Sequence, residues 1–138
     1  MPGKTVFLDT NVFLYAAGRA HPHRDACAAV LTAVADGTLD ATTSVEVIQE
    51  ILHVLTRRGL RDKALSLAAS VTDLIPDLLP VRKADLDRAR MLLADDPTLS
   101  VRDAVHAGTL LAHGLDHILS LDKDFDRIPG VRRLEALE

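Results

Sequence analysis

Five acidic residues stand out because each ends a strand-like segment or interrupts the apolar face of a predicted helix. Asp9 follows the apolar run of residues 6–8, which places its carboxylate at the edge where open α/β sheets carry their chemistry. The other four are Glu50, Asp103, Asp122 and Asp124. Carboxylates gathered from distant segments repel one another unless cations hold them, and hard cations such as Mg²⁺ or Mn²⁺ prefer oxygen ligands. The pattern therefore indicates metal-assisted chemistry on phosphodiesters.

Two glutamates in the amphipathic segment 44–58 compete for the site, and the helical periodicity separates them. At about 100° per residue, Glu46 falls in the middle of the polar face, whereas Glu50 falls beside Val54 at the edge of the apolar arc. Glu46 also stands three residues after Thr43, a spacing that fits a capping box. Because Glu46 has this structural explanation, we prefer Glu50 as the site residue.

Asp103 lies on the apolar side of the predicted helix 100–113, between Ala107 and Leu110. A buried carboxylate without a partner is unfavourable, so this position indicates a partner for the charge. The alternative is a capping box that begins at Ser100, with Asp103 stabilised by the positive end of the helix dipole. Both interpretations stay open, because an acid in the first turn can cap the helix and also bind a metal.

Asp122 repeats the strand-then-acid pattern of Asp9, because it follows the strand-like segment 117–121, and Asp124 comes two residues later. The alternative here is a polar turn in which the acids serve as turn formers. An EF-hand calcium loop is excluded, because its glycine and its distal glutamate are missing. Zinc is not expected, since the six histidines are scattered and the chain has no Cys/His ligand motif. Glycine-rich nucleotide-binding loops are absent from the sequence as well.

Strand-like and helical segments alternate along the chain, which predicts a mainly parallel sheet covered by helices. The expected strands are residues 5–8, 40–43, 78–81, 117–121 and 131–134. The expected helices are residues 12–17, 23–35, 44–58, 61–74, 84–94 and 100–113. Asn11 is the predicted N-cap of the first helix. Because no linker, repeat or low-complexity tract interrupts this order, we expect an α/β fold formed by one domain over residues 1–138.

The composition is typical of a globular protein. The chain has 138 residues, 48% of them hydrophobic, which is enough for a substantial core, and its formal net charge is −4. The sequence shows no signal peptide and no apolar run long enough for a bilayer, and Cys27 is its only cysteine. We therefore expect a cytoplasmic protein without membrane contact. The net charge does not indicate a nucleic-acid binder, but basic clusters at residues 57–63 and 82–90 could contact phosphates or could be solvated helix faces.

Four stretches of the chain, taken together, resemble the PIN-domain ribonucleases, and most closely the VapC toxins of bacterial toxin–antitoxin pairs. They are residues 6–12 (VFLDTNV), 43–52 (TSVEVIQEIL), 102–107 (RDAVHA) and 118–125 (ILSLDKDF). Their order and spacing, and the chain length, agree with that family over nearly the whole chain. Each motif is weak alone, but the four in this order are specific.

The resemblance implies a three-layer α/β/α sandwich with a short, mainly parallel sheet and the activity of a metal-dependent endoribonuclease. The catalytic carboxylates that it implies are Asp9, Glu50, Asp103 and Asp122. The implied ligands of Mg²⁺ or Mn²⁺ are Asp9, Asp103, Asp122 and Asp124, with Asn11 and Ser120 orienting carboxylates or water. The implied substrate is structured RNA such as tRNA or rRNA, cleaved by metal-activated water. The implied partners are a VapB-like antitoxin and a second copy of the chain.

Other classes of protein compete with this interpretation. A haloacid-dehalogenase-like phosphatase also carries an aspartate after its first strand, but its second early aspartate would fall at Asn11. A non-catalytic, degenerate PIN module would hold RNA or a partner without cleaving it, but such a module has little reason to keep acids that repel one another. A DNA-directed flap nuclease needs added DNA-binding elements, for which this chain is too short.

Overall fold

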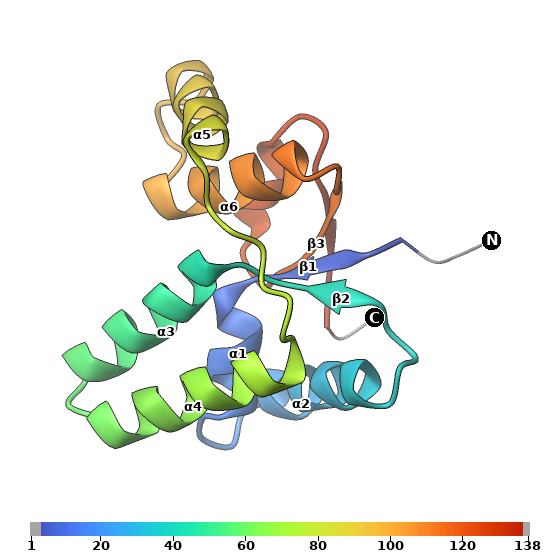
Figure 1. The fold of residues 1–138 in the computed structure, drawn as a ribbon, viewed down its shortest axis with the longest axis vertical. Coiled ribbons are helices and arrows are strands. Elements are labelled where there is room, and N and C mark those ends of the chain that lie inside the picture. The colour runs from blue at the N-terminus through green and yellow to red at the C-terminus, as the bar shows by residue number, and fades with distance from the viewer. Residues whose placement is uncertain (1–3, 137–138) are drawn as a thin grey trace.

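A parallel sheet of four short strands forms the centre of the protein (Figure 1), and the computed structural model describes residues 4–136. The strands are β1 (Val6–Leu8), β2 (Ala41–Thr42), β3 (His117–Leu119) and β4 (Arg132–Leu134), in the order β2-β1-β3-β4. Every neighbouring pair runs parallel, and Phe7 of β1 is aligned with Thr42 on one side and Ile118 on the other. The carboxyl ends of the strands therefore share one edge of the sheet, where the residues that follow them converge.

Six α-helices cover this sheet within the described residues. They are α1 (Thr10–Ala16), α2 (Pro22–Ala35), α3 (Val45–Arg57), α4 (Arg61–Leu74), α5 (Lys83–Asp95) and α6 (Val101–Ala112), and a short 3₁₀ helix, η1 (Lys123–Arg127), follows β3. In Figure 1, α5 and α6 lie on one side of the strands and α1 to α4 on the other. The predicted α/β/α sandwich is thus confirmed. None of the described helices is long and apolar enough to cross a membrane.

The central strand β1 is buried along its whole length because helices cover both of its faces. Val6, Phe7 and Leu8 are all buried, as the continuous apolar run of an inner parallel strand requires. Phe13 of α1 and Ile118 of β3 complete the packing around them and are fully buried. The apolar run before the first acid therefore belongs to the core, and Asp9, the first acidic residue of the site, follows directly after it.

Residues 78–81 do not form the strand that the sequence predicted. Leu79 makes only an isolated bridge: its N–H donates to the carbonyl of Thr43 (2.9 Å), and its own carbonyl accepts from the N–H of Val45 (3.0 Å). Pro80 follows directly, and proline has no N–H with which to extend a ladder. The prediction was wrong because this apolar run connects α4 to α5 instead of joining the sheet.

The caps of two helices also differ from the predicted ones. Asp9, not Asn11, is the N-cap of α1, and its carboxylate accepts a hydrogen bond from the N–H of the next residue (2.8 Å). The Thr43 hydroxyl donates to the carbonyl of Leu8 (2.8 Å) instead of forming the predicted capping box with Glu46. Asp9 therefore replaces Asn11 as the local cap, whereas at Thr43 a contact across the sheet edge replaces local capping. The other predicted helices and strands are confirmed, with ends that differ by no more than two residues.

The helices α5 and α6 pack most closely at Gly108. A Cβ added there would lie 2.7 Å from the carbonyl oxygen of Asp85 and 3.0 Å from the backbone nitrogen of Ala89. Both are backbone atoms of α5, which cannot give way unless the whole helix shifts. Glycine at this position therefore sets the separation of the two helices and, through it, the position of α6 against the sheet.

The substitution Gly108→Ala tests this contact. Helix propensity alone predicts a gain of about 1 kcal/mol in the free energy of unfolding. Overpacking a close contact costs about 1–3 kcal/mol, and we expect this effect to win because the obstructing atoms belong to the backbone. Urea unfolding should therefore show a less stable variant. A variant more stable than the wild type would show that propensity wins and that the helices can separate without strain.

Candidate active site

The carboxyl edge of the sheet brings together acidic residues that lie far apart in the chain. Asp9 follows β1 directly, and Asp122 comes shortly after the end of β3. Asp103 reaches the same edge from the first turn of α6, where its N–H donates to the hydroxyl of Ser100 (3.1 Å). The Ser100 half of the predicted capping box is thus present. The side chain of Asp103 faces the other acids, so the contact of its N–H with Ser100 leaves the carboxylate in the acidic group.

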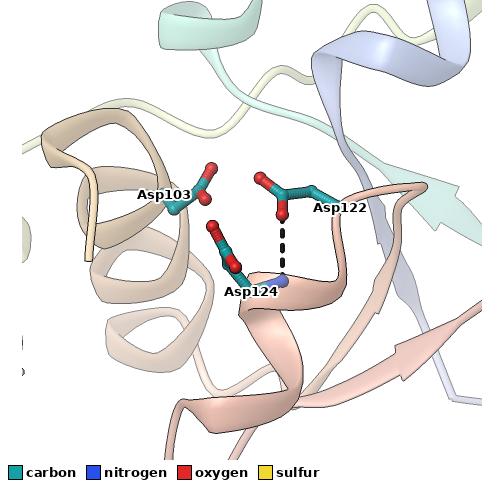
Figure 2. Close-up of side chains that lie close together, drawn as sticks. All are labelled: Asp103, Asp122 and Asp124. Carbon is teal, nitrogen blue, oxygen red and sulfur yellow. Dashed lines mark hydrogen bonds between the residues drawn. The ribbon is translucent and has the colours of Figure 1, made fainter. Parts of the chain in front are cut away.

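Asp103, Asp122 and Asp124 point toward one another (Figure 2), and each offers a carboxylate oxygen within 4.8 Å of the other two. The helix η1 is the local cause of this arrangement. Asp122 caps η1, and its Oδ1 accepts a hydrogen bond from the N–H of Asp124 (2.9 Å). Arg127, at the end of η1, donates to Oδ1 of Asp124 (2.7 Å) and orients that side chain. The polar turn considered from the sequence is therefore a short helix that sets two carboxylates beside Asp103.

The carboxyl group of Asp103 is hard to ionise in this setting. Burial raises its pKa, and the hydrogen bond and charge of Asp122 raise the pKa further, to about 7. A divalent cation between these groups would favour their ionised forms and offset the repulsion. Convergent carboxylate oxygens are also the ligands that Mg²⁺ and Mn²⁺ prefer. The residues present therefore fit such a cation.

Asp9, the fourth predicted metal ligand, lies beside this group of three. Its Oδ2 accepts a hydrogen bond from the hydroxyl of Ser120 (2.6 Å), whose oxygen in turn accepts from the N–H of Asp122 (3.0 Å). The amide of Asn11 also donates to Ser120 (3.4 Å). Burial raises the pKa of Asp9, while the charge of His106 and the Ser120 hydrogen bond act in the opposite direction. Asn11 and Ser120 therefore lie where the resemblance implies orienting groups, and Ser120 joins the ends of β1 and β3.

Glu50 reaches the site from α3 and is held by two residues of α6. Its Oε1 is hydrogen-bonded to Nε2 of His106, and its Oε2 lies 3.8 Å from the guanidinium of Arg102. Burial alone would raise the pKa of Glu50, but the hydrogen bond and charge of His106, with the charge of Arg102, outweigh it and lower the pKa. Glu50 therefore stays ionised where Asp103 takes up a proton. Glu46, the glutamate that we did not prefer, is half-buried one turn earlier.

His106 is the residue of this site that the sequence analysis missed. Only 1% of it is exposed, and its Nε2 lies 3.7 Å from Oδ1 of Asp9. The periodicity of residues 100–113 places it with His113 on the polar side of the helix, which does not indicate burial. However, it follows Asp103 by three residues, and residues three apart share a face of a helix. That spacing was the signal that could have found it.

Comparison with known proteins shows the family to which this chain belongs. Residues 6–131 match the PIN domain family. Ribonuclease VapC13 of Mycobacterium tuberculosis is 30% identical over 129 residues, which cover 94% of this chain and 98% of that protein. Ribonuclease VapC7 of the same species is 36% identical over 127 residues, which cover 91% of this chain and 88% of that protein. The chain therefore belongs to the PIN-domain family, and these two relatives are VapC ribonucleases.

Solved structures share the fold over nearly the full length of the chain. VapBC2 from Rickettsia felis, bound to a DNA fragment from its promoter, superposes with a TM-score of 0.75 at 16% identity, covering 95% of this chain and 98% of that one. A toxin–antitoxin complex from Klebsiella pneumoniae superposes with a TM-score of 0.65 at 18% identity, covering 92% of this chain and 95% of that one. At these identities the likeness concerns the fold alone.

Binding of Mn²⁺ to the three aspartates should depend on pH through Asp103. Its pKa is raised from 3.8 to about 7 in the folded protein, so its contribution to stability is fully present below 3.8 and is lost as the pH rises through about 7. A cation that binds the ionised form restores stability above that pH, whereas below it the proton competes. Thermal unfolding should therefore show that Mn²⁺ raises Tm more at about pH 8 than at about pH 6.

A matched control comes from η1 itself. Asp126 lies two residues after Asp124, but its carboxylate binds the guanidinium of Arg133 (3.0 Å) instead of facing the acidic group. The variant Asp126→Asn should therefore keep the Mn²⁺ shift in Tm, and Asp103→Asn should lose most of it. Equal shifts at the two pH values would show that Asp103 does not bind the cation.

Proposed function

We propose that this protein is a metal-dependent endoribonuclease and the toxin of a VapBC-type toxin–antitoxin pair. The observation that carries the proposal is the convergence of Asp103, Asp122 and Asp124 at the carboxyl edge of a PIN-domain sheet. The names of the relatives, which are VapC ribonucleases, support RNA as the substrate. Within that class we propose structured RNA such as tRNA or rRNA, with Mg²⁺ or Mn²⁺ as the cofactor.

In this proposal the aspartates would hold the cation, whereas Glu50 would help to arrange the reactants. Asp103, Asp122 and Asp124 would hold the cation, with Asp9 as the further ligand that Ser120 keeps in place. A divalent cation bound there supplies Lewis acidity, which lowers the pKa of water and stabilises negative charge on the leaving oxygen. Asp103 must give up its proton to take part, so its raised pKa makes it the residue whose ionisation limits assembly of the site.

Arg102 and Glu50 would act on the side of the substrate. The Arg102 side chain is 65% exposed, adjoins Asp103 in the chain and lies 3.8 Å from Glu50. An exposed guanidinium at the rim of an acidic site suits a phosphate oxygen, because arginine binds phosphates through paired hydrogen bonds. Only 3% of the residues are aromatic, which offers few rings for base stacking. Contacts to phosphates and RNA shape would therefore dominate recognition, and binding should weaken with salt.

The energetics of the acidic group argue against a non-catalytic PIN module. Burial of Asp103 beside Asp122 raises the pKa of Asp103 to about 7, which destabilises the protein wherever that group is ionised. In a module that only holds a partner nothing offsets this penalty, whereas in a cation site the bound cation would offset it. The phosphatase alternative is weaker still, because the PIN domain match spans residues 6–131 and Asn11 occupies the position of the second aspartate.

We also propose that the antitoxin occupies a groove of about 810 Å³ formed by α1, the loop after it, α3 and α4. The groove begins at Asn11, beside the acidic site, and apolar side chains such as Leu14 line part of it. Its lining includes Arg19, Arg58 and Lys63 but no acidic residue of the described chain. An amphipathic segment with acidic side chains fits that combination. The Klebsiella structure, a toxin–antitoxin complex, supports a partner of this kind, and a homodimer remains part of the proposal through the resemblance.

The variant Asp103→Asn tests the proposed activity. Wild-type protein with Mg²⁺ or Mn²⁺ should cut a pool of tRNA and rRNA at discrete positions, and a chelator should abolish the cuts. Asp103→Asn should cut at least about 100-fold more slowly, because a neutral amide binds a hard cation far less well. Asp126→Asn should cut at the wild-type rate, since its carboxylate binds Arg133 outside the acidic group.

Each other result of that experiment has a definite meaning. Cutting by Asp103→Asn at the wild-type rate would refute the site assignment. A folded wild type that binds Mn²⁺ but cuts nothing in the pool would refute the proposed substrate class. A wild type that neither cuts nor binds Mn²⁺ would favour the non-catalytic module.

Charge reversal in the groove tests the proposed antitoxin site. The double variant Arg58→Glu/Lys63→Glu should no longer co-purify with the proposed VapB-like antitoxin when the two are co-expressed, because like charges would repel an acidic segment. The control is Arg57→Glu/Arg61→Glu, which changes the charge equally at neighbouring residues outside the groove lining. Loss of the partner from both double variants, or from neither, would show that the groove does not hold it.

A further inference from the structure

The imidazole of His106 lies between two acids of the site. Neither the three aspartates that would hold a cation nor the proposed substrate contacts explain its position. His106 is fully buried on α6, with its Nε2 hydrogen-bonded to Glu50 and 3.7 Å from Oδ1 of Asp9. Because both neighbours of Nε2 are carboxylates, this nitrogen carries a proton and donates it. One imidazole thus joins three elements: α6, the middle of α3 and the residue that follows β1.

The rest of the His106 ring packs against the core. The ring lies against Phe7 of β1, with 5.7 Å between the ring centroids. Its Nδ1 is buried and has no hydrogen-bond partner among the described residues. A buried polar atom without a partner is unfavourable, so packing alone does not explain a histidine here. The polar contact that remains for this side chain is the one to Glu50 and Asp9.

Glu50 is consequently fixed by α6 on both of its oxygens. His106 binds Oε1, and Arg102, one turn earlier on the same helix, lies 3.8 Å from Oε2. The carboxylates within 4.8 Å of one another are those of Asp103, Asp122 and Asp124, and Glu50 is not among them. The contacts from α6 therefore hold the buried Glu50 carboxylate apart from the group that fits the cation.

We propose that His106 is a positioning residue, which holds the Glu50 carboxylate beside Asp9 so that Glu50 serves the reaction without joining the metal ligands. This inference rests on the proposed nuclease function. It predicts that His106 contributes to turnover through Glu50 and leaves the affinity for the cation unchanged. A histidine with only a structural role in the core would affect stability, but its loss would not lower kcat while the affinity for the cation stays unchanged.

Two variants and a control test the proposal. His106→Leu removes the donor and keeps an apolar side chain, whereas His106→Gln keeps an N–H close to the position of Nε2. For His106→Leu we expect kcat for RNA cleavage to fall about 10- to 100-fold, the usual effect of losing a group that orients a functional side chain. His106→Gln should recover most of that loss, and KM should change little in either variant. The control is His113→Leu at the C-cap of α6, because that ring bonds to the carbonyl of Thr109 (2.8 Å) and lies beside Asp85, away from the acids of the site, and should leave kcat unchanged.

Two further measurements do not need RNA cleavage. The dissociation constant for Mn²⁺, from calorimetry on the purified chain, should be the same for His106→Leu as for the wild type. A thermal double-variant cycle with Glu50→Leu should be non-additive, because His106→Leu alone leaves a buried carboxylate without its hydrogen-bond donor and the double variant does not.

The outcomes separate this inference from the nuclease proposal. If the wild type does not cleave RNA, the proposed function fails, and additive Tm changes would then also overturn the link between His106 and Glu50. If the wild type cleaves and His106→Leu cleaves equally well, or His106→Gln is as slow as His106→Leu, the positioning role is wrong. A loss of Mn²⁺ affinity in parallel with kcat would show that His106 acts on the metal ligands instead of on Glu50.

Discussion

Repulsion between carboxylates at the carboxyl edge of a parallel sheet is the constraint on which the rest of this structure depends. The topology forces the ends of β1 and β3 together, and with them Asp9 and Asp122. Charges at such short range interact strongly wherever burial lowers the effective dielectric constant. The protein offsets part of this repulsion with hydrogen bonds, such as those that join Asp9 and Asp122 through Ser120. The repulsion that is not offset contributes, with burial, to the raised pKa of Asp103.

The acids fall into two electrostatic classes, and α6 creates the difference. Glu50 is surrounded by donors from α6 and has a lowered pKa, whereas Asp103 faces Asp122 and has a raised one. Protein groups already offset the charge of Glu50, whereas the raised pKa of Asp103 shows that the charge of its ionised form is not fully offset. The helix can do this because residues three apart share a face, so Asp103 and His106 reach the site together. The close approach of α5 at Gly108 holds that helix in place.

Much of the site could be predicted because its signals are local in the chain. An apolar run followed by an acid identifies the residues after β1 and β3, and interruption of an apolar helical face singled out Glu50 and Asp103. The predictions that were wrong concern groups whose partners are distant in sequence. The capping box at Thr43 did not form because its hydroxyl reaches the carbonyl of Leu8, 35 residues away. Residues 78–81 make only an isolated bridge to Ser44, because Pro80 has no N–H with which to extend a ladder.

The sequence by itself determined the alternation of strands and helices, the points at which apolar runs end in acids, and the family to which the chain belongs. These follow from periodicity and from motif order, which depend on neighbours along the chain. Only the tertiary structure decided which acids meet as a group of three, which acid is compensated, and that His106 stands between Glu50 and Asp9. The physical reason is that burial and the distance between charges set these properties, and both arise when distant segments pack at one edge of the sheet.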